Sequence, residues 1–257
     1  MSCHPRVTEW TTIIQTHLPH LSKPQATVLA LWSLGMVLAR SCALTAVSAC
    51  LATWLGRKEP TVRQQLRELC YEVTAKRGTA RCALVVEPCF APLLAWGVGQ
   101  WEGTPLALAL DATTLGARFT VLAISIVYRG CAIPVAWTVL AATAKHAWRR
   151  EWLRMLRQVR RAVPRSWTVL VLADRGWYAR WLFRRITRLG WHPFLRINTG
   201  GTFRPQGQVR GGRCRPWCPS RAQPGRERAW LSKAVTASCT APCWPAGRRV
   251  TKIHGCS

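Results

Sequence analysis

Acidic residues are scarce in this sequence. Ten Asp and Glu stand against 37 Lys and Arg, so the formal net charge is +27 at pH 7, and only Asp111 and Asp174 are aspartates. A chain this basic is typical of a protein that meets a polyanion, because contacts to phosphates release condensed counterions. Ribosomal and membrane-surface proteins can also be this basic, but they seldom carry 15 Trp. Nucleic acid is therefore the leading partner.

Long apolar runs are also missing. The longest candidate, residues 26–52, is interrupted by Arg40 and by several Ser and Thr, whereas a membrane span needs about 20 mainly apolar residues. The first residues show no basic segment followed by an apolar one, so no signal peptide is predicted. We therefore expect a cytoplasmic chain without a membrane partner, whose 12 cysteines are reduced thiols rather than a disulfide framework.

Residues 24–76 have the apolar spacing of helices. Thr45 is a plausible cap and Gly56 a plausible stop for the second of three helices, and Pro60 suits the start of the third. Three short helices of this kind resemble a helix-turn-helix unit, with an ordinary helical bundle as the alternative. Residues 78–103 are predicted to be a connector. The polar residues of the third helix that could read DNA are Arg63, Gln64, Gln65 and Arg67.

The pattern changes at residue 105. The runs "LALALDAT", "FTVLAISIVYRG" and "AIPVAWTVL" alternate like strands and are joined by short turns. A helix over 146–163, a strand over 167–174, a helix over 178–190 and a strand over 192–198 follow. This order, β-β-β-α-β-α-β, predicts a mixed sheet with flanking helices. Beyond Gly201 the chain is dense in Gly, Pro, Arg and Cys without periodicity, which predicts disorder.

The helix predicted over 146–163 separates apolar from basic residues. Trp148, Trp152, Met155, Leu156 and Val159 share one face. Its Trp residues, with Trp177 and Trp181, could stack on bases, but their helical spacing favours packing in the core. The segment 145–196 contains 14 Lys and Arg against Glu151 and Asp174. The arginines expected to contact the DNA backbone are Arg150, Arg154, Arg157, Arg161, Arg175, Arg180 and Arg184.

The two aspartates both end apolar runs. Asp111 ends the first predicted strand and Asp174 the fourth, so parallel pairing of these strands would bring the two carboxylates together. Carboxylates at such short range repel unless a cation lies between them, and Mg²⁺ prefers carboxylate oxygens. Two such ions could clamp a phosphodiester. Alternatively, Asp111 is a turn residue and Asp174 caps the helix that starts near Tyr178.

Two segments carry a family resemblance. "ALDATTLGARFTVLAISIVYRGCAIPVAWTVL" and "VLADRGWYARWLFRRITRLGWHPFLRIN" resemble the catalytic core of DDE transposases of bacterial insertion sequences, in the insertion-sequence-four (IS-four) family. Residues 21–52 and "TVRQQLREL" resemble the helical N-terminal region of the same proteins, so the resemblance extends over residues 20–205.

The resemblance implies an RNase H-like fold. It also implies three metal-binding acids, among them Asp111 and Asp174, which hold Mg²⁺ or Mn²⁺ for phosphodiester cleavage and strand transfer at transposon ends. The partner would be double-stranded DNA at the nucleoid, in a synaptic complex that a homodimer could form. The expected division is a helical region over 1–103, a partial RNase H-like core over 104–200 and a basic, disordered tail over 201–257.

The third acid is where the sequence departs from this family. After Asp174 the one remaining acid is Glu227, whose spacing is short and whose neighbours do not match the family signature. The tail can be back-translated so that a one-base shift gives an acidic, family-like segment; we therefore expect an out-of-frame tail and no third acid. The alternative function is then an inactive DNA-binding remnant. The pairs Cys214–Cys218 and Cys239–Cys243 could suggest zinc, but coincidence in a Cys-rich tail is the favoured explanation.

Overall fold

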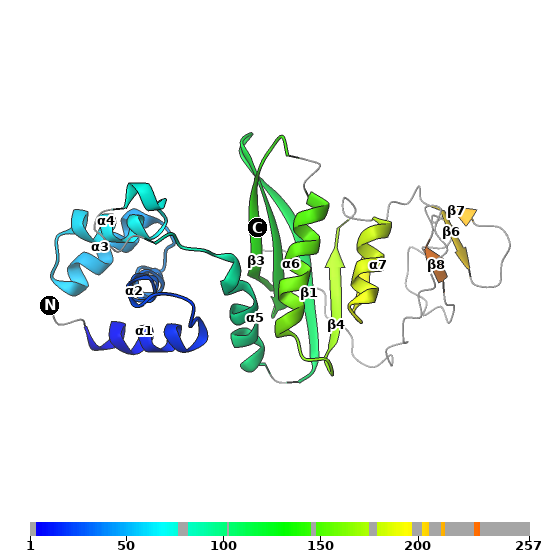
Figure 1. Cartoon of the computed structure of the whole chain (residues 1–257), viewed down its shortest axis with the longest axis horizontal. Helices are drawn as coiled ribbons and strands as arrows, with labels where there is room; N and C mark the ends of the chain where they lie inside the picture. Colours follow the sequence, from blue (N-terminus) through cyan, green and yellow to red (C-terminus); the bar gives the residue numbers. More distant parts are fainter. Residues whose placement is uncertain are drawn as a thin grey trace. The chain divides into compact units, whose positions relative to one another are not determined.

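The computed structural model describes residues 4–76, 82–101, 103–144, 148–174 and 179–196, together with the backbone of three short strands further on. The chain divides into two units, residues 1–168 and 169–257, and Figure 1 shows their helices and strands. Before the first strand lie α1 (Pro5–His17), α2 (Lys23–Ala39), α3 (Leu44–Leu55), α4 (Glu59–Leu69), η1 (Val73–Ala75), η2 (Glu87–Cys89) and α5 (Phe90–Gly99).

The predicted order of strands and helices from residue 105 onward is confirmed. The elements are β1 (Pro105–Leu115), β2 (Phe119–Tyr128), β3 (Cys131–Ala141), α6 (Trp148–Ala162), β4 (Thr168–Ala173), α7 (Arg180–Arg188) and β5 (His192–Leu195). The strands form a five-stranded sheet in the order β3-β2-β1-β4-β5. Pairing is antiparallel among β1, β2 and β3 and parallel between β4 and β5. The predicted architecture, a mixed sheet with flanking helices behind a helical N-terminal region, is confirmed.

One face of the β1–β2–β3 meander carries the core. Leu108 pairs with Ile126 and Leu110 with Ile124, and all four side chains are buried because alternate residues of a strand point to the same face. Helices α5 and α6 contact each other, and both contact β3. The apolar face predicted for α6 is confirmed for its four innermost residues, which are Trp152, Met155, Leu156 and Val159.

The N-terminal helices follow the predicted boundaries with two corrections. Gly56 ends α3 with φ 61°, and Pro60 lies in the first turn of α4. Thr45 is not the cap of α3, because the helix begins one residue earlier, behind Ala43, without a side-chain cap. The predicted connector over 78–103 contains the helix α5, whose Pro92 and Gly97 obscured its helical pattern.

Helix α1 was not predicted as a separate helix, although it lies in the region 1–103 that was expected to be helical. It contains four threonines, which have low helix propensity, but each Thr hydroxyl donates to the carbonyl four residues earlier, as Thr11 Oγ1 does to Val7 O at 2.6 Å.

The C-terminal tail, which was predicted to be disordered, contains three short strands whose backbone is described. They are β6 (Thr202–Pro205), β7 (Gly212–Arg213) and β8 (Ala229–Leu231). The rest of that segment lies outside the described residues, so its disorder stays a prediction.

The polar side chains of α4 are engaged within the helical region. Arg63 pairs with Glu59 at 3.1 Å, and Gln64 donates to Glu68 Oε1 at 3.0 Å. Gln65 accepts from Arg57 Nη1 at 3.0 Å. The three-residue turn from α3 to α4 keeps the helix-turn-helix interpretation open. However, these contacts engage three of the four side chains that were predicted to read DNA.

No single helix of the described chain is long and apolar enough to cross a membrane. Helices α2 and α3 pass that test only as a pair, bent by 96°, and only by length and composition. Their buried side chains pack together with those of α1 and α4 in one cluster, which includes Leu31, Val47, Leu51 and Leu66.

Close packing of α2 on α3 generates the first prediction. A methyl group at Gly35 would lie 2.7 Å from Leu51 Cδ1 and 2.8 Å from Val47 Cγ1. Gly35→Ala should therefore lower stability by about 1–3 kcal/mol through overpacking, seen as a lower midpoint in thermal unfolding. Gly99→Ala is the matched control, since a methyl group there meets nothing within 4 Å. Equal midpoints for both variants would contradict this account of the α2–α3 contact.

Candidate functional site

Asp111 lies inside β1 rather than at its end. The strand continues to Leu115, because the β-branched residues Thr113 and Thr114 favour extended backbone. The sequence prediction that a strand ends at Asp111 is therefore wrong, and so is the alternative of a turn residue. Asp111 pairs with Ala123 of β2. Its side chain is exposed, and Oδ2 accepts a hydrogen bond from Thr113 Oγ1 at 3.0 Å.

Asp174 follows the last residue of β4, as predicted. Its side chain is 68% exposed and pairs with Arg196 Nη1 at 3.2 Å. The backbone N–H of Arg196 also donates to Ala173 O at 2.9 Å, and this hydrogen bond keeps the backbone of Arg196 next to the end of β4. The alternative role as a helix cap is wrong, because α7 begins at Arg180 with Ala179 in the capping position.

The described residues do not bring three potential metal ligands together. Asp111 belongs to the first unit and Asp174 to the second, and their sharing of one ion stays a prediction. Glu227, Arg175, Trp177 and the two Cys pairs lie outside the described residues. Within the part of the chain that is described, no group of three His, Cys, Asp or Glu could hold a metal ion. The described residues thus do not fit the three-acid Mg²⁺ centre that the family resemblance implies.

Helix α6 exposes a row of arginines. Arg150, Arg157 and Arg161 are exposed, and no ion pair within the described ranges engages them. At 100° per residue they lie within about 40° of one another around the helix, opposite the buried face. We name these three residues the α6 basic stripe.

Arg154 shares the face of the α6 basic stripe but is used differently. It forms ion pairs with Glu87 of η2 and with Glu151 one turn earlier in α6. Its side chain is only 35% exposed, and Nη2 also lies 3.5 Å from Thr138 Oγ1 of β3. The sequence did not distinguish Arg154 from its neighbours, because its acidic partner Glu87 lies 67 residues away in the chain.

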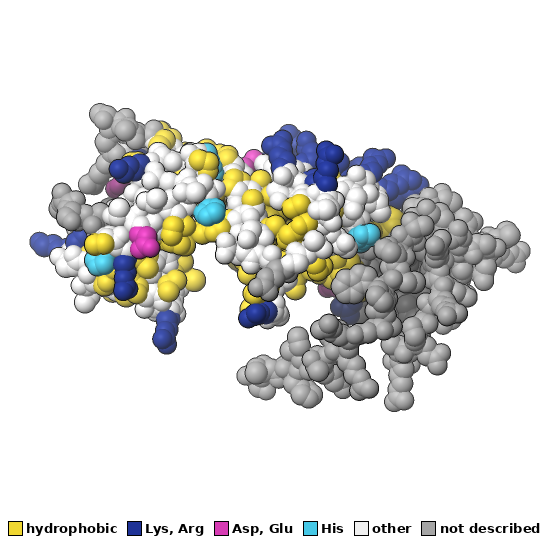
Figure 2. All heavy atoms as spheres, turned by 90° about the horizontal axis from the view of Figure 1, so that it is seen from below, with side chains coloured by type: hydrophobic (Ala, Val, Ile, Leu, Met, Phe, Trp, Pro, Cys, Tyr) yellow, Lys and Arg dark blue, Asp and Glu magenta, His cyan; other side chains and the backbone are white. Residues whose placement is uncertain are grey.

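Helix α7, in the second unit, also has a buried apolar face and a row of exposed arginines. Leu182 and Ile186 are buried, while Arg180, Arg184 and Arg188 are exposed at four-residue spacing. Arg188 was missed by the sequence analysis, although the same spacing would have found it. Figure 2 shows that Lys and Arg side chains far outnumber Asp and Glu on the visible surface.

The tryptophans of α6 and α7 favour the packing interpretation. Trp152 is 1% exposed, so its ring cannot stack on a base without the core opening. Trp148 and Trp181 are half-buried. Packing in the core is confirmed for Trp152.

Comparisons with known proteins yield only distant structural likenesses. No family model matches the chain, and no curated protein is similar to it. A crystal structure of the Mos1 strand transfer complex matches with a TM-score of 0.23 and 15% identity, covering 65% of this chain and 56% of that chain. The Mos1 transposase paired-end complex with the left transposon end matches with a TM-score of 0.24 and 14% identity, covering 65% and 57%. This chain therefore spans just over half the length of those proteins, and no activity follows from so weak a likeness.

The Asp174–Arg196 ion pair generates a prediction about metal binding. A ligand that binds only the folded state at 100 times its Kd stabilises it by about 2.7 kcal/mol. Because the described residues offer no group of three ligands and Asp174 already pairs with Arg196, millimolar Mg²⁺ or Mn²⁺ should leave the thermal midpoint of the chain unchanged. Asp174→Asn is the control and should respond identically. A metal-induced rise in the midpoint that disappears in Asp174→Asn would show that Asp174 is a metal ligand.

Proposed function

We propose that this chain is a transposase-like protein that binds duplex DNA through the arginines of α6 and α7 without cutting it. The observation that carries the proposal is the α6 basic stripe. The apolar face of the helix is buried against the sheet, so Arg150, Arg157 and Arg161 must face solvent. The packed helix fixes the backbone that carries these arginines, and the planar guanidinium fork matches phosphate geometry.

The length of the stripe suits a duplex backbone. From Arg150 to Arg161 the helix rises about 16 Å, at 1.5 Å per residue, and duplex DNA presents one negative charge per ≈ 1.7 Å of its axis. The three guanidiniums can thus contact phosphates together. Contacts of this kind carry no sequence information, so the proposal is for binding that depends on charge rather than on base sequence.

The transposase part of the proposal rests on the acids and the sheet. An aspartate in β1 and another directly after β4 support the resemblance to IS-four transposases, and the strands and helices follow one another along the chain in the predicted order. We extend the proposal to an origin in a bacterial insertion sequence, to a cytoplasmic, nucleoid-associated location and to a homodimer on transposon ends. The second candidate function, metal-dependent cleavage and strand transfer, is favoured by the exposed carboxylates of Asp111 and Asp174 but needs a third acid.

Salt dependence tests the DNA-binding proposal. The affinity for a labelled duplex should fall linearly with salt on logarithmic axes, and replacing Arg150, Arg157 and Arg161 together by Ala should lower the slope by roughly one unit per arginine. Fluorescence anisotropy at a series of salt concentrations measures this slope.

Arg154→Ala supplies the matched control on the same helix. It removes the same charge, but from a residue already paired with Glu87 and Glu151. The salt slope should stay as in the wild type, while the thermal midpoint should fall because two carboxylates lose their partner. Binding that does not respond to salt, or a slope that the triple variant leaves unchanged, would contradict the proposed interface.

Cleavage distinguishes the two candidate functions. Fixing two metal ions on a phosphodiester requires several oriented carboxylates, and the described residues supply no such group. The purified chain should therefore fail to nick or join transposon-end DNA with Mg²⁺ or Mn²⁺ in a gel assay, and Asp111→Ala and Asp174→Ala should leave duplex affinity intact. Metal-dependent nicking that either substitution abolishes would establish the active transposase instead, and its loss in Glu227→Gln would identify the third acid.

A further inference from the structure

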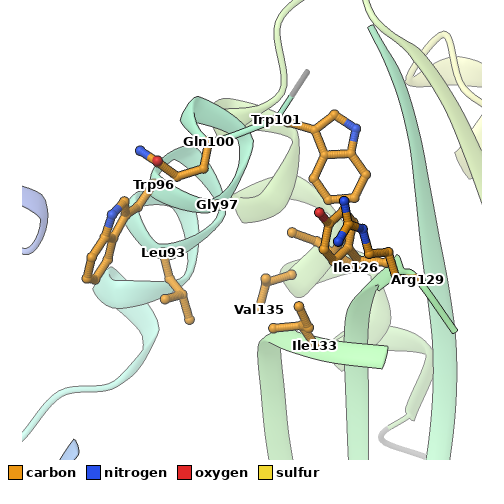
Figure 3. Close-up of a pocket in the computed structure, with 10 residues that line it drawn as sticks. Leu93, Trp96, Gly97, Gln100, Trp101, Ile126, Arg129, Ile133 and Val135 are labelled. Carbon is orange, nitrogen blue, oxygen red and sulfur yellow. The ribbon is translucent and has the colours of Figure 1, made fainter. Parts of the chain in front are cut away.

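A cavity of about 640 Å³ lies between α5 and the β2–β3 hairpin. Figure 3 shows Leu93 of α5 on one side and Ile126, Ile133 and Val135 of the hairpin on the other. Ile126 and Val135 are buried and make its apolar floor. The volume falls within the range of pockets that hold small molecules. Neither the acids nor the α6 basic stripe line this cavity.

Aromatic rings that are held by neighbours line the cavity. Trp96 stacks on His17 of α1, with 4.4 Å between ring centroids and 5° between the ring planes. Trp101, just beyond the end of α5, lies 4.9 Å from Tyr128 at the end of β2, with the rings tilted by 56°. Rings fixed in this way lose little freedom when a flat ligand enters, so the cavity is pre-organised for a planar, aromatic group.

Arg129 is the one charged residue that lines the cavity within the described part of the chain. Arg129 and Gly130 form the two-residue hairpin turn, with φ 47° and φ 82°. A turn of this kind favours Asn, Asp or Gly at its first position, and a side chain such as that of Arg is strained there. The guanidinium lies 5.2 Å from the centre of the Tyr128 ring. Backbone strain at the rim of an aromatic cavity points to a functional use of the residue.

We propose that this cavity binds a single unstacked nucleobase of a nucleic acid, with Arg129 contacting the adjoining phosphate. The inference rests on the proposed DNA-binding function and extends it to unpaired or distorted sites. Bases stack on aromatic side chains whatever their identity, because every base has a π-face. The exposed amide of Gln100 at the rim offers both a donor and acceptors to the edge of the base.

The charge at the cavity selects this occupant over an apolar side chain of a protein partner. Among the described residues, the lining includes one cation and no acid, and the chain carries a net charge of +27. A ligand that joins a flat aromatic group to a negative charge satisfies both the rings and Arg129. A nucleotide within a strand has this chemistry, whereas an apolar side chain would leave Arg129 without a role.

Three labelled DNAs test the proposal with the full chain: a perfect duplex, the same duplex with one bulged base, and that bulge without its base. Fluorescence anisotropy should give an affinity for the bulged base about tenfold higher than for the abasic bulge, in line with the stacking of one base. Arg129→Asn and Trp101→Ala should each reduce this preference severalfold or more and leave the affinity for the perfect duplex unchanged. Asn at position 129 removes the guanidinium and accepts the positive φ.

Arg118→Asn is the matched control. Arg118 precedes β2 at the other end of the meander and lies 5.4 Å from the ring of Phe119, but it does not line the cavity. It should keep the preference for the bulged base. Equal affinity for the base and abasic bulges, or a preference that survives both cavity variants, would overturn the inference while leaving duplex binding in place. Failure to bind any of the three DNAs would overturn the proposed function, and this inference with it.

Discussion

Burial of the apolar face of α6 against the sheet is the constraint on which the proposed interface depends. Trp152, Met155, Leu156 and Val159 are almost fully removed from water, and turning the helix about its axis would expose them at a cost of roughly 1.5–3 kcal/mol for each large side chain. The helix therefore has one orientation. That orientation leaves the α6 basic stripe in solvent, where contact with phosphates costs no rearrangement of the core.

The arginines of α6 have two different roles: Arg154 forms ion pairs within the protein, whereas those of the α6 basic stripe are exposed to solvent. Arg154 is drawn inward by Glu87 and Glu151, and since all three side chains are partly shielded from water, their attraction is screened less than that of exposed pairs. Among the described residues no ion pair engages the α6 basic stripe, so its arginines remain available to a polyanion. A chain with so few acids thus uses two of them to fix a helix, and this clarifies why counting arginines alone overstates the binding surface.

Asp111 and the aromatic cavity lie at different places on the same β1–β2–β3 meander. In the β1–β2 pair, Asp111 lies opposite Ala123, several residues from Tyr128 at the β2–β3 turn. Strands rise about 3.3 Å per residue, so Ala123 and Tyr128 are separated by about 16 Å along β2. A nucleic acid could therefore contact the cavity without contacting Asp111, which makes recognition of an unstacked base independent of any cleavage chemistry.

The sequence alone determined the order of strands and helices after residue 105 and the buried face of α6, because period-two and period-3.6 patterns report directly which residues a strand or helix must bury. It also found the Arg rows of α6 and α7. It missed α1 and α5, where threonine, proline and glycine weaken the helical pattern, and it ended β1 at Asp111 because a carboxylate within a strand looks like a boundary. Only the tertiary structure decided that Arg154 pairs with Glu87 and Asp174 with Arg196, and that α5 and the β2–β3 hairpin line an aromatic cavity. Each of these depends on residues far apart in the chain, whose contact is set by packing rather than by spacing in sequence.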